Sequence, residues 1–368
     1  MIKVSHSESE PADESRMFDE SEVTKVTRTQ RLREMVNEGV VVPFKIAWSD
    51  WRTKIGLIII GMFVLTAVLT ALHKGGTYIL NDFLGLTGVE WRLHRPSSIL
   101  SVDEAWRREL KPFENMEYPL GTDRSGRGLL SAITWSTPAM LKMIIAGGVF
   151  SSVMATVVGT VAGYKRGRAE TFLMTVSDIA MSIPGIPLVI VMIVIIQPDS
   201  PYVLGALITI NVWAGLARTV HSQVLSIREE SYVEASRAMG IRTPRIIQKD
   251  ILPRLMPYVM VNFVYASRRV IYDSVALYFL GFLPIKTPNN WGVMMNWAYE
   301  QNGALTPDGP QYMIIVPMLP IIFLSLGFIL ISQGTDRLFN PRVRTRHEGE
   351  TRAEEGPTEE DTTQTGIQ

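Results

Sequence analysis

Several apolar runs, each close to the length that a lipid bilayer requires, constrain this chain more than any other feature. A helix needs about 20 predominantly apolar residues to cross the hydrocarbon core. Ile55–Leu72 is apolar throughout, and five further runs lie at about 140–164, 172–196, 202–220, 257–282 and 312–332. We therefore expect an all-α polytopic membrane protein with six transmembrane helices.

Composition excludes several other classes of protein. With 46% hydrophobic residues in 368, the chain is too apolar for an ordinary soluble domain. Its net charge is +0 and no basic stripe carries interleaved aromatic residues, so nucleic acid is not an expected partner. The absence of cysteine excludes disulfides, thiolate metal sites and cysteine nucleophiles. None of the five histidines stands at ligand spacing from another, so no metal site is expected.

The order of polar and apolar segments predicts five regions. Residues 1–43 are polar and lack the early apolar core of a signal peptide, so we interpret them as a cytoplasmic tail. Residues 44–72 combine an interfacial segment with the first span, and 73–138 form a charged extracytoplasmic segment. Residues 139–334 are the transmembrane core, and the acidic, threonine-rich 335–368 read as a disordered cytoplasmic tail.

A polar insert, residues 221–256, interrupts the apolar core between spans four and five. Val233 and Ala238, with Met239 beside them, suggest a modest apolar face in its first helix. Gly240 ends that helix where a left-handed residue is common. Thr243-Pro244 then resembles an N-cap followed by proline at the first helical position.

After this second start, Ile247, Ile251 and Leu255 follow at helical spacing, and Pro253 interrupts the run. We expect a helix, a sharp turn and a second helix on the cytoplasmic side.

This insert resembles the "EAA" loop of permease subunits of ABC importers, and the resemblance implies a type I importer permease fold. Serine stands where the family usually has its second alanine. In that family the loop carries a coupling helix that docks on a partner ATPase. The residues matched here, and so the expected ATPase-coupling loop, are Glu234, Ala235, Ser236, Ala238, Gly240, Thr243, Pro244, Leu252 and Pro253.

Other stretches resemble the dipeptide, oligopeptide and nickel branch of these permeases, in the same order along the chain. Tyr118–Arg127 is similar to "HPLGTDxxGRD", with Tyr118 in place of histidine, and offers charge pairing of Asp123 with Arg124 and Arg127. This motif is either a structural collar before the second span or a contact for a substrate-delivering protein. The remaining matches are Gly159-Thr160…Gly163-Tyr164, Asp178…Pro184, Gln223–Arg228, Leu277–Gly281, Trp291-Gly292 and Leu338–Arg342.

Two local features predict how the spans pack. Gly147, Gly148, Gly159 and Gly163 in the second span allow close contact between helices. Prolines at 184 and 187 free backbone carbonyls, so the third span should kink or break there.

Basic short loops fix the orientation of the six spans. With a cytoplasmic N-terminus, Lys165–Arg168, the polar insert and Arg337–Arg346 all lie inside, as the positive-inside rule expects. We therefore expect a multi-pass protein of the plasma membrane with both termini in the cytoplasm.

The resemblance implies a set of partners that supply energy and cargo. These are a homologous second permease, two ATPases that use ATP and Mg, and an extracytoplasmic binding protein. The chain itself has no G-x-x-x-x-G-K-[ST] loop and no nucleophile–base set, so we expect no enzyme activity and no bound cofactor. Peptides, nickel chelates and sugars are all carried on this scaffold, and the residues do not choose among them.

Charged residues within the spans are candidates for the transport pathway. Span five contains Arg268, Arg269 and Asp273, and span three contains Asp178. Charges at such depth usually face a cavity or a partner. Arg269 and Asp273 are four residues apart and can pair with each other, or an arginine can line the pathway and meet substrate. Asp178 is either a packing acceptor or a substrate ligand, the former being favoured.

Two other classes of function remain open. A self-powered secondary transporter or channel would have no use for a polar helical hairpin of this composition. A membrane enzyme is disfavoured by the missing catalytic groups. Co-purification of an ATPase separates the first from an ABC permease, and turnover by the isolated chain would support the second.

Overall fold

The computed structural model describes residues 50–72, 108–283 and 290–338, and these are helical apart from short connections. The predicted tail 1–43, most of the extracytoplasmic segment, and residues 339–368 of the predicted tail 335–368 lie outside the described residues. Residues 335–338, predicted to begin the disordered tail, are instead the end of the last helix. Within the described part the only β-type pairing is an isolated bridge between Thr122 and Gly128. The fold is therefore all-α, as the apolar runs predict.

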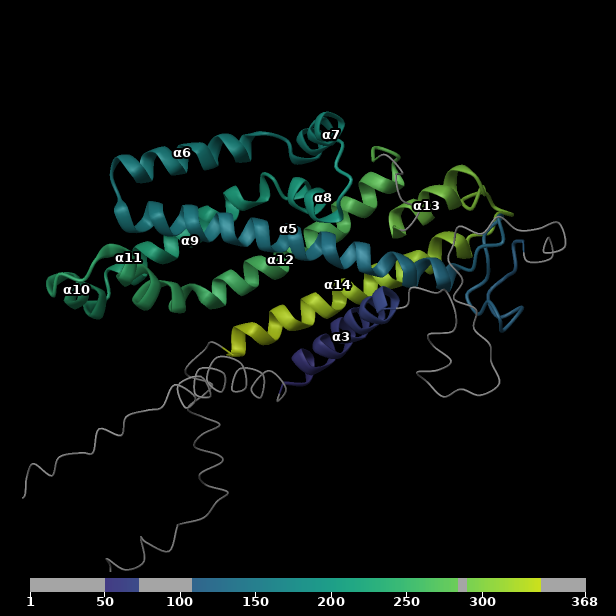
Figure 1. Ribbon diagram of the computed structural model, residues 1–368, viewed down its shortest axis with the longest axis horizontal. Coiled ribbons are helices and arrows are strands. Elements are labelled where there is room, and N and C mark those ends of the chain that lie inside the picture. The colour runs from purple at the N-terminus through teal and green to yellow at the C-terminus, as the bar shows by residue number, and fades with distance from the viewer. Residues whose placement is uncertain (1–49, 73–107, 284–289, 339–368) are drawn as a thin grey trace, which may run out of the picture. The chain divides into compact units, whose positions relative to one another are not determined.

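Twelve elements follow one another along the described chain (Figure 1). The first span is α3, the second is α5, and two bent pairs, α6–α7 and α8–α9, follow. The polar insert forms α10 and α11, a π turn η4 leads into α12, and α13 precedes the last span, α14. Their bounds are α3 Trp51–Leu72, α5 Leu129–Lys165, α6 Arg168–Ser182, α7 Gly185–Ile196, α8 Pro201–Ile208, α9 Val212–Arg228, α10 Ser231–Ala238, α11 Thr243–Ile246, η4 Ile247–Ile251, α12 Leu252–Phe279, α13 Trp291–Glu300 and α14 Tyr312–Leu338.

Three of these helices, α3, α5 and α14, are each long and apolar enough to cross a membrane. Counting each bent pair as one broken span raises the number to five. Helix α12 has 28 residues, contains Arg268, Arg269 and Asp273, and is not among these candidate spans. A membrane protein is thus supported, and α12 as the sixth span stays a prediction.

Two helix boundaries differ from the expected spans. Helix α5 begins at Leu129 instead of near Met140, with Pro138 inside it. Its 37 residues correspond to about 55 Å, well beyond the thickness of the hydrocarbon core, so one end must project from the membrane. The fourth span is also broken, at Thr209–Asn211, where no proline signals a break, with a bend of 61°.

The predicted break at Pro184 is present. Helices α6 and α7 meet there at 89°, and Pro184 is the residue that caps α7. Backbone groups freed in a membrane need other partners, so the carbonyls at this break require donors from elsewhere in the fold.

Helix α5 is the centre of the packing, and its glycines are the points of closest approach. A Cβ on Gly159 would lie 2.5 Å from the Ala217 carbonyl oxygen of α9, and one on Gly163 would lie 2.8 Å from Val224 Cβ. A Cβ on Gly147 would likewise lie too close to residues of α8 and α12, and one on Gly148 too close to residues of α12. The close helix contact predicted from these four glycines is confirmed.

The collar motif folds against the opposite end of the bundle from α10 and α11 (Figure 1). Gly121 and Gly126 have φ of 81° and 73°, left-handed conformations that suit tight turns. Asp123 Oδ1 accepts hydrogen bonds from the backbone N–H groups of Ser125 and Arg127 at 2.9 and 2.8 Å. Burial nevertheless raises the pKa of Asp123 above its ordinary range.

The expected pairing of Arg124 with Asp123 is wrong. Arg124 Nε instead donates to Glu109 at 3.1 Å, because the chain turns at Gly121 and brings residues 109–111 alongside 121–123. Arg127 lies over the Trp297 ring at 5.0 Å, which ties the collar to α13.

Gly159 offers a direct test of this packing. We expect Gly159→Val to lower the thermal stability of the solubilised protein by the equivalent of about 1–3 kcal/mol, because the α5–α9 contact cannot absorb a side chain. Gly61→Val is the matched control, since a Cβ at Gly61 meets nothing within 4 Å. The measurement is fluorescence-detected size-exclusion chromatography after heating. Equal stability of the two variants would show that the contact is loose.

Candidate functional site

The polar insert folds into a short helix, a tight turn and a second helix at one end of the bundle (Figure 1). Gly240 has φ of +74°, the left-handed conformation expected of it. Its N–H donates to the Arg237 carbonyl at 3.0 Å, and the Ile241 N–H donates to the Ser236 carbonyl at 3.2 Å. This pair of hydrogen bonds is a Schellman motif, which satisfies the last carbonyls of α10. We call α10, this turn and α11 the tip.

The second helix of the insert begins one residue earlier than expected. Arg242 is the N-cap residue, and Thr243 and Pro244 occupy the first two helical positions. Pro253 does not interrupt the run, contrary to the prediction. The π turn Ile247–Ile251 lets the Leu252 N–H donate to the Ile247 carbonyl five residues back, and Pro253 then sits in the first turn of α12, where its missing N–H is tolerated. The tip is therefore continuous with α12.

A buried apolar cluster anchors the tip to three other helices. Val233 of α10 and Ile246 of α11 are 0% and 1% exposed. They join residues of α5, α9, η4 and α12: Tyr164, Val220, Val224, Ile251 and Leu255. Burial on this scale removes each side chain from water and makes the tip a fixed part of the bundle.

Aromatic rings and arginines reinforce the same contact. Arg237 of α10 lies over the Tyr164 ring of α5 at 5.6 Å, and Arg254 of α12 lies over the Tyr232 ring at 4.2 Å. Arg228 donates to the Tyr164 carbonyl at 2.9 Å. Burial raises the pKa of Tyr232 above its ordinary value. These contacts join α10 directly to α5 and α12.

The predicted apolar face of the first helix is wrong in part. Val233 and Ser236, three residues apart, form the buried side, whereas Ala238 is exposed and Met239 is 71% exposed. Ala238 stands five positions from Val233, which turns it well away from the cluster. The serine in place of the usual alanine therefore packs inward, and Met239 becomes part of the outer surface.

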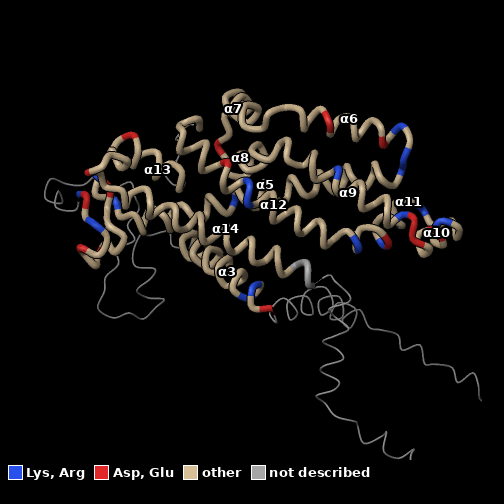
Figure 2. Tube along the Cα trace, turned by 180° about the vertical axis from the view of Figure 1, so that it is seen from behind, with Lys and Arg blue, Asp and Glu red and all other residues tan. Residues whose placement is uncertain are grey.

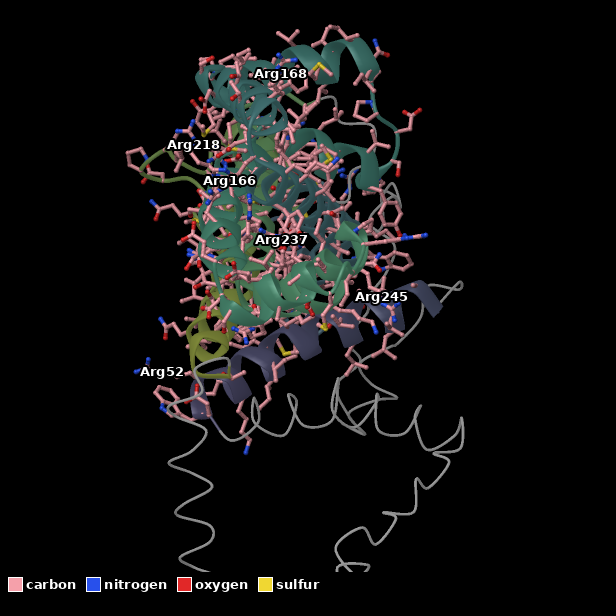
Figure 3. The ribbon with its side chains drawn as sticks, turned by 90° about the vertical axis from the view of Figure 1, so that its left-hand side faces the viewer. Arg52, Arg166, Arg168, Arg218, Arg237 and Arg245 are labelled. Carbon is pink, nitrogen blue, oxygen red and sulfur yellow. The ribbon has the colours of Figure 1, made fainter. Side chains whose placement is uncertain are left out.

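The outer surface of the tip mixes small, apolar and charged side chains. Basic side chains gather at this end of the bundle, as the labelled Arg166, Arg168, Arg237 and Arg245 show (Figure 3). The exposed members of the predicted coupling loop are Glu234, Ala235, Ala238, Gly240, Thr243 and Pro244, beside exposed Met239, Arg242 and Arg245. Such a surface suits contact with another protein, since small residues permit close approach and charges set orientation.

The remaining predicted loop residues lie elsewhere. Leu252 is half-buried and Pro253 is exposed at the start of α12. Leu252 and Pro253 therefore lie outside the tip, and η4 connects them to it.

The charged residues near the middle of α12 have two kinds of partner, a carboxylate for Arg269 and an aromatic ring for Arg268. Arg269 Nε donates to Asp273 Oδ2 at 3.1 Å, the i, i+4 pair that the spacing allows. Arg268 lies over the Tyr272 ring at 6.0 Å, and its Nε atom is buried with no hydrogen-bond partner among the described residues. Arg268 is the span-five cation that has an aromatic neighbour and no carboxylate partner among the described residues.

Asp178 pairs with a different helix. It accepts a hydrogen bond from Arg218 of α9, so the structure gives it a partner between α6 and α9 instead of one among the α12 charges. Across the described residues no three His, Asp or Glu side chains come together in a way that could hold a metal ion.

Comparison with known proteins agrees with this geometry. The family described as "Binding-protein-dependent transport system inner membrane component" matches residues 155–345, which include the tip and the last span. The chain belongs to this family.

Curated relatives of this inner membrane component are permease subunits. It is 30% identical over 226 residues to the dipeptide transport system permease protein DppC of Bacillus subtilis, covering 61% of this chain and 68% of the relative. It is 32% identical over 234 residues to the oligopeptide permease OppC of Haemophilus influenzae, covering 61% and 70%. With OppC of Bacillus subtilis the match extends over 298 residues at 26% identity, covering 80% and 87%. The permease reading of the sequence is thus confirmed.

Sequence reasoning missed the residues that hold the tip of this permease in place. Tyr164 belongs to the family-like match at the end of the second span, but that match did not indicate its role, and two arginines lie against its ring. Arg218 and His221 also carry no motif, although both pair with carboxylates of α6. Such pairs join residues about 40 to 73 positions apart, so only the fold brings them together.

The turn at Gly240 gives a prediction for the tip. Gly240→Val should strain the left-handed residue by roughly 1–2 kcal/mol and loosen the turn, because space is open there and only the backbone conformation is at stake. We expect faster trypsin cleavage after Arg242 in the folded protein. Gly240→Asn is the control, since asparagine tolerates this conformation and should cleave at nearly the wild-type rate. Unchanged cleavage in Gly240→Val would contradict the account.

Proposed function

We propose that this permease forms half of the translocation pathway of an ATP-driven importer of peptides, and that it works by alternating access. The observation that carries the proposal is the tip. Its outer surface is exposed while its inner side is fixed to α5, α9 and α12 by the buried cluster, so a partner that moves the tip moves the bundle.

Peptides are the cargo that the relatives favour. The names of similar proteins include dipeptide, oligopeptide and glutathione transport permeases, and all three substrates contain peptide-type bonds and carboxylates. Arg268 is chemically suited to such a cargo, because a guanidinium binds carboxylate or carbonyl oxygens through several N–H groups.

The energy for transport is supplied by partner subunits in this proposal. The chain carries no phosphate-binding loop, so two ATPases would use ATP and Mg, each contacting one permease tip. A homologous second permease completes the pathway, and an extracytoplasmic binding protein delivers the cargo. ATP binding can shift the equilibrium between inward- and outward-facing states only by its different affinity for the two.

The distribution of charge supports the orientation. Charged residues gather at the two ends of the helices, with few between them (Figure 2). The end that carries the tip has short basic connections, which the positive-inside rule places in the cytoplasm. The collar and α13 then face outward, with 139–334 as the membrane core and both tails inside.

The docking proposal is tested by a charge reversal on the tip. We expect a tagged wild-type chain, gently solubilised from its native membrane, to bring down an ATPase and measurable ATP hydrolysis. Glu234→Lys should lose both, because it reverses the acidic group on the exposed side of α10. Glu300→Lys makes the same change on exposed α13 at the other end and should retain the ATPase. Recovery of the wild-type chain alone would favour a self-powered transporter.

The pathway assignment predicts different behaviour for two neighbouring arginines. In the reconstituted complex, with a tritiated tripeptide that the wild type imports, Arg268→Gln should raise KM for uptake by about tenfold or more, since it removes a charge-assisted hydrogen-bond donor. The double variant Arg269→Gln/Asp273→Asn removes an internal pair together and should leave KM near the wild-type value. A larger effect of the double variant than of Arg268→Gln would reverse the assignment.

A further inference from the structure

Helix α6 is held to the rest of the subunit with little apolar burial. Of its residues only Ser177 is fully buried. Large apolar side chains on it are exposed, among them Phe172 at 67% and Ile179 at 57%. Apolar packing therefore does not account for its position, although α6 lies alongside α9 (Figure 1).

Three polar contacts join α6 to α9 instead, spread along the length of α6. Glu170 Oε1 lies 2.8 Å from His221 Nε2 near the tip end. Asp178 pairs with Arg218 further along. At the far end the Asn211 side-chain amide donates to the Ile183 carbonyl at 3.3 Å. We call these three contacts the α6–α9 clasp.

The contact between Asn211 and Ile183 joins the break between α6 and α7 to the break between α8 and α9. Ile183 precedes Pro184, where α6 gives way to α7, and Asn211 is the residue that caps α9 after the break from α8. A Cβ on Gly185 would lie 3.1 Å from the Asn211 amide nitrogen, so the two breaks are in close contact. A carbonyl freed by a proline in a membrane must find a donor, and Asn211 supplies one.

The central contact is stable only if α6 and α9 stay together. The Asp178 and Arg218 side chains are 50% and 54% exposed within two candidate spans, where separated charges would meet lipid or a narrow aqueous path. Charges at such depth are costly when unpaired. Separation of α6 from α9 would therefore expose two unpaired charges at once.

We propose that the α6–α9 clasp makes these helices one rigid pair, which carries a displacement of the tip to the breaks at Pro184 and at Thr209–Asn211. Arg218, His221 and Asn211 are positioning residues in this step. Helix α9 ends two residues before α10, so the tip acts on α9 first, and the clasp extends that motion to α6. The inference rests on the proposed docking of an ATPase at the tip.

The test measures two distances in the complete transporter. The chain contains no cysteine, so spin labels can be placed cleanly on introduced cysteines. Thr175→Cys with Ser222→Cys reports the α6–α9 separation, and Ser222→Cys with Ile322→Cys reports α9 against α14; all three positions are exposed. Both pairs are measured by the dipolar interaction of the labels, with and without a non-hydrolysable ATP analogue.

The expected result is a fixed α6–α9 distance and a changed α9–α14 distance when the analogue binds. In Arg218→Gln the α6–α9 distribution should broaden, and ATP hydrolysis should continue with less peptide imported per ATP. The reversed pair Asp178→Arg/Arg218→Asp should restore a narrow distribution. Arg52→Gln, which removes an exposed arginine of α3, is the matched control and should leave the α6–α9 distance unchanged.

Three outcomes would overturn the proposal. These are an α6–α9 distance that shifts with the analogue in the wild type, an α9–α14 distance that does not change, and an Arg218→Gln variant with an unbroadened distribution. Failure of the docking proposal is read separately, as loss of the ATPase subunits from the same purified sample.

Discussion

Close contact between α5 and its neighbours is the constraint on which the rest of the structure depends. Apolar side chains gain little by leaving lipid for another helix, so packing itself must hold the bundle together. The glycines of α5 allow α9, α8 and α12 to approach, and only then does Tyr164 reach the arginines of α9 and α10. The position of the tip thus follows from small residues far from it along the chain.

The same bundle is held in two different ways. Helices α3 and α14 pack through small residues, where a Cβ on Gly56 would lie 2.8 Å from the Gly327 carbonyl oxygen. Helix α6 is held by the polar clasp instead. The close packing of α3 against α14 opposes sliding of these two helices along their whole interface. The clasp, in contrast, holds α6 only at its three polar contacts. A transporter needs both kinds of contact, because part of it must keep its shape while another part carries motion.

The sequence correctly predicted those structural features that depend on a single residue type and its neighbours along the chain. The left-handed turn at Gly240, the break at Pro184 and the glycine contacts of α5 each follow from the conformational freedom or size of one residue type. The predicted interruption of the helix at Pro253 was wrong, because the effect of this proline depends on the π turn that precedes it. The break at Thr209–Asn211 has no proline, and the pairing of Arg218 with Asp178 joins two spans, so neither is visible without the fold. The domain boundaries and the role of each loop residue remain predictions.

Contact between the tip and an ATPase is the central claim, and a photo-crosslink in the native membrane tests it most directly. A photoreactive amino acid at exposed Ala235 should form a covalent adduct with an ATPase subunit, identified by mass spectrometry. The same group at exposed Leu305, at the opposite end, should form none with that subunit. Adducts from Ala235 to lipid or to another membrane protein alone, or ATPase adducts from Leu305, would contradict the account.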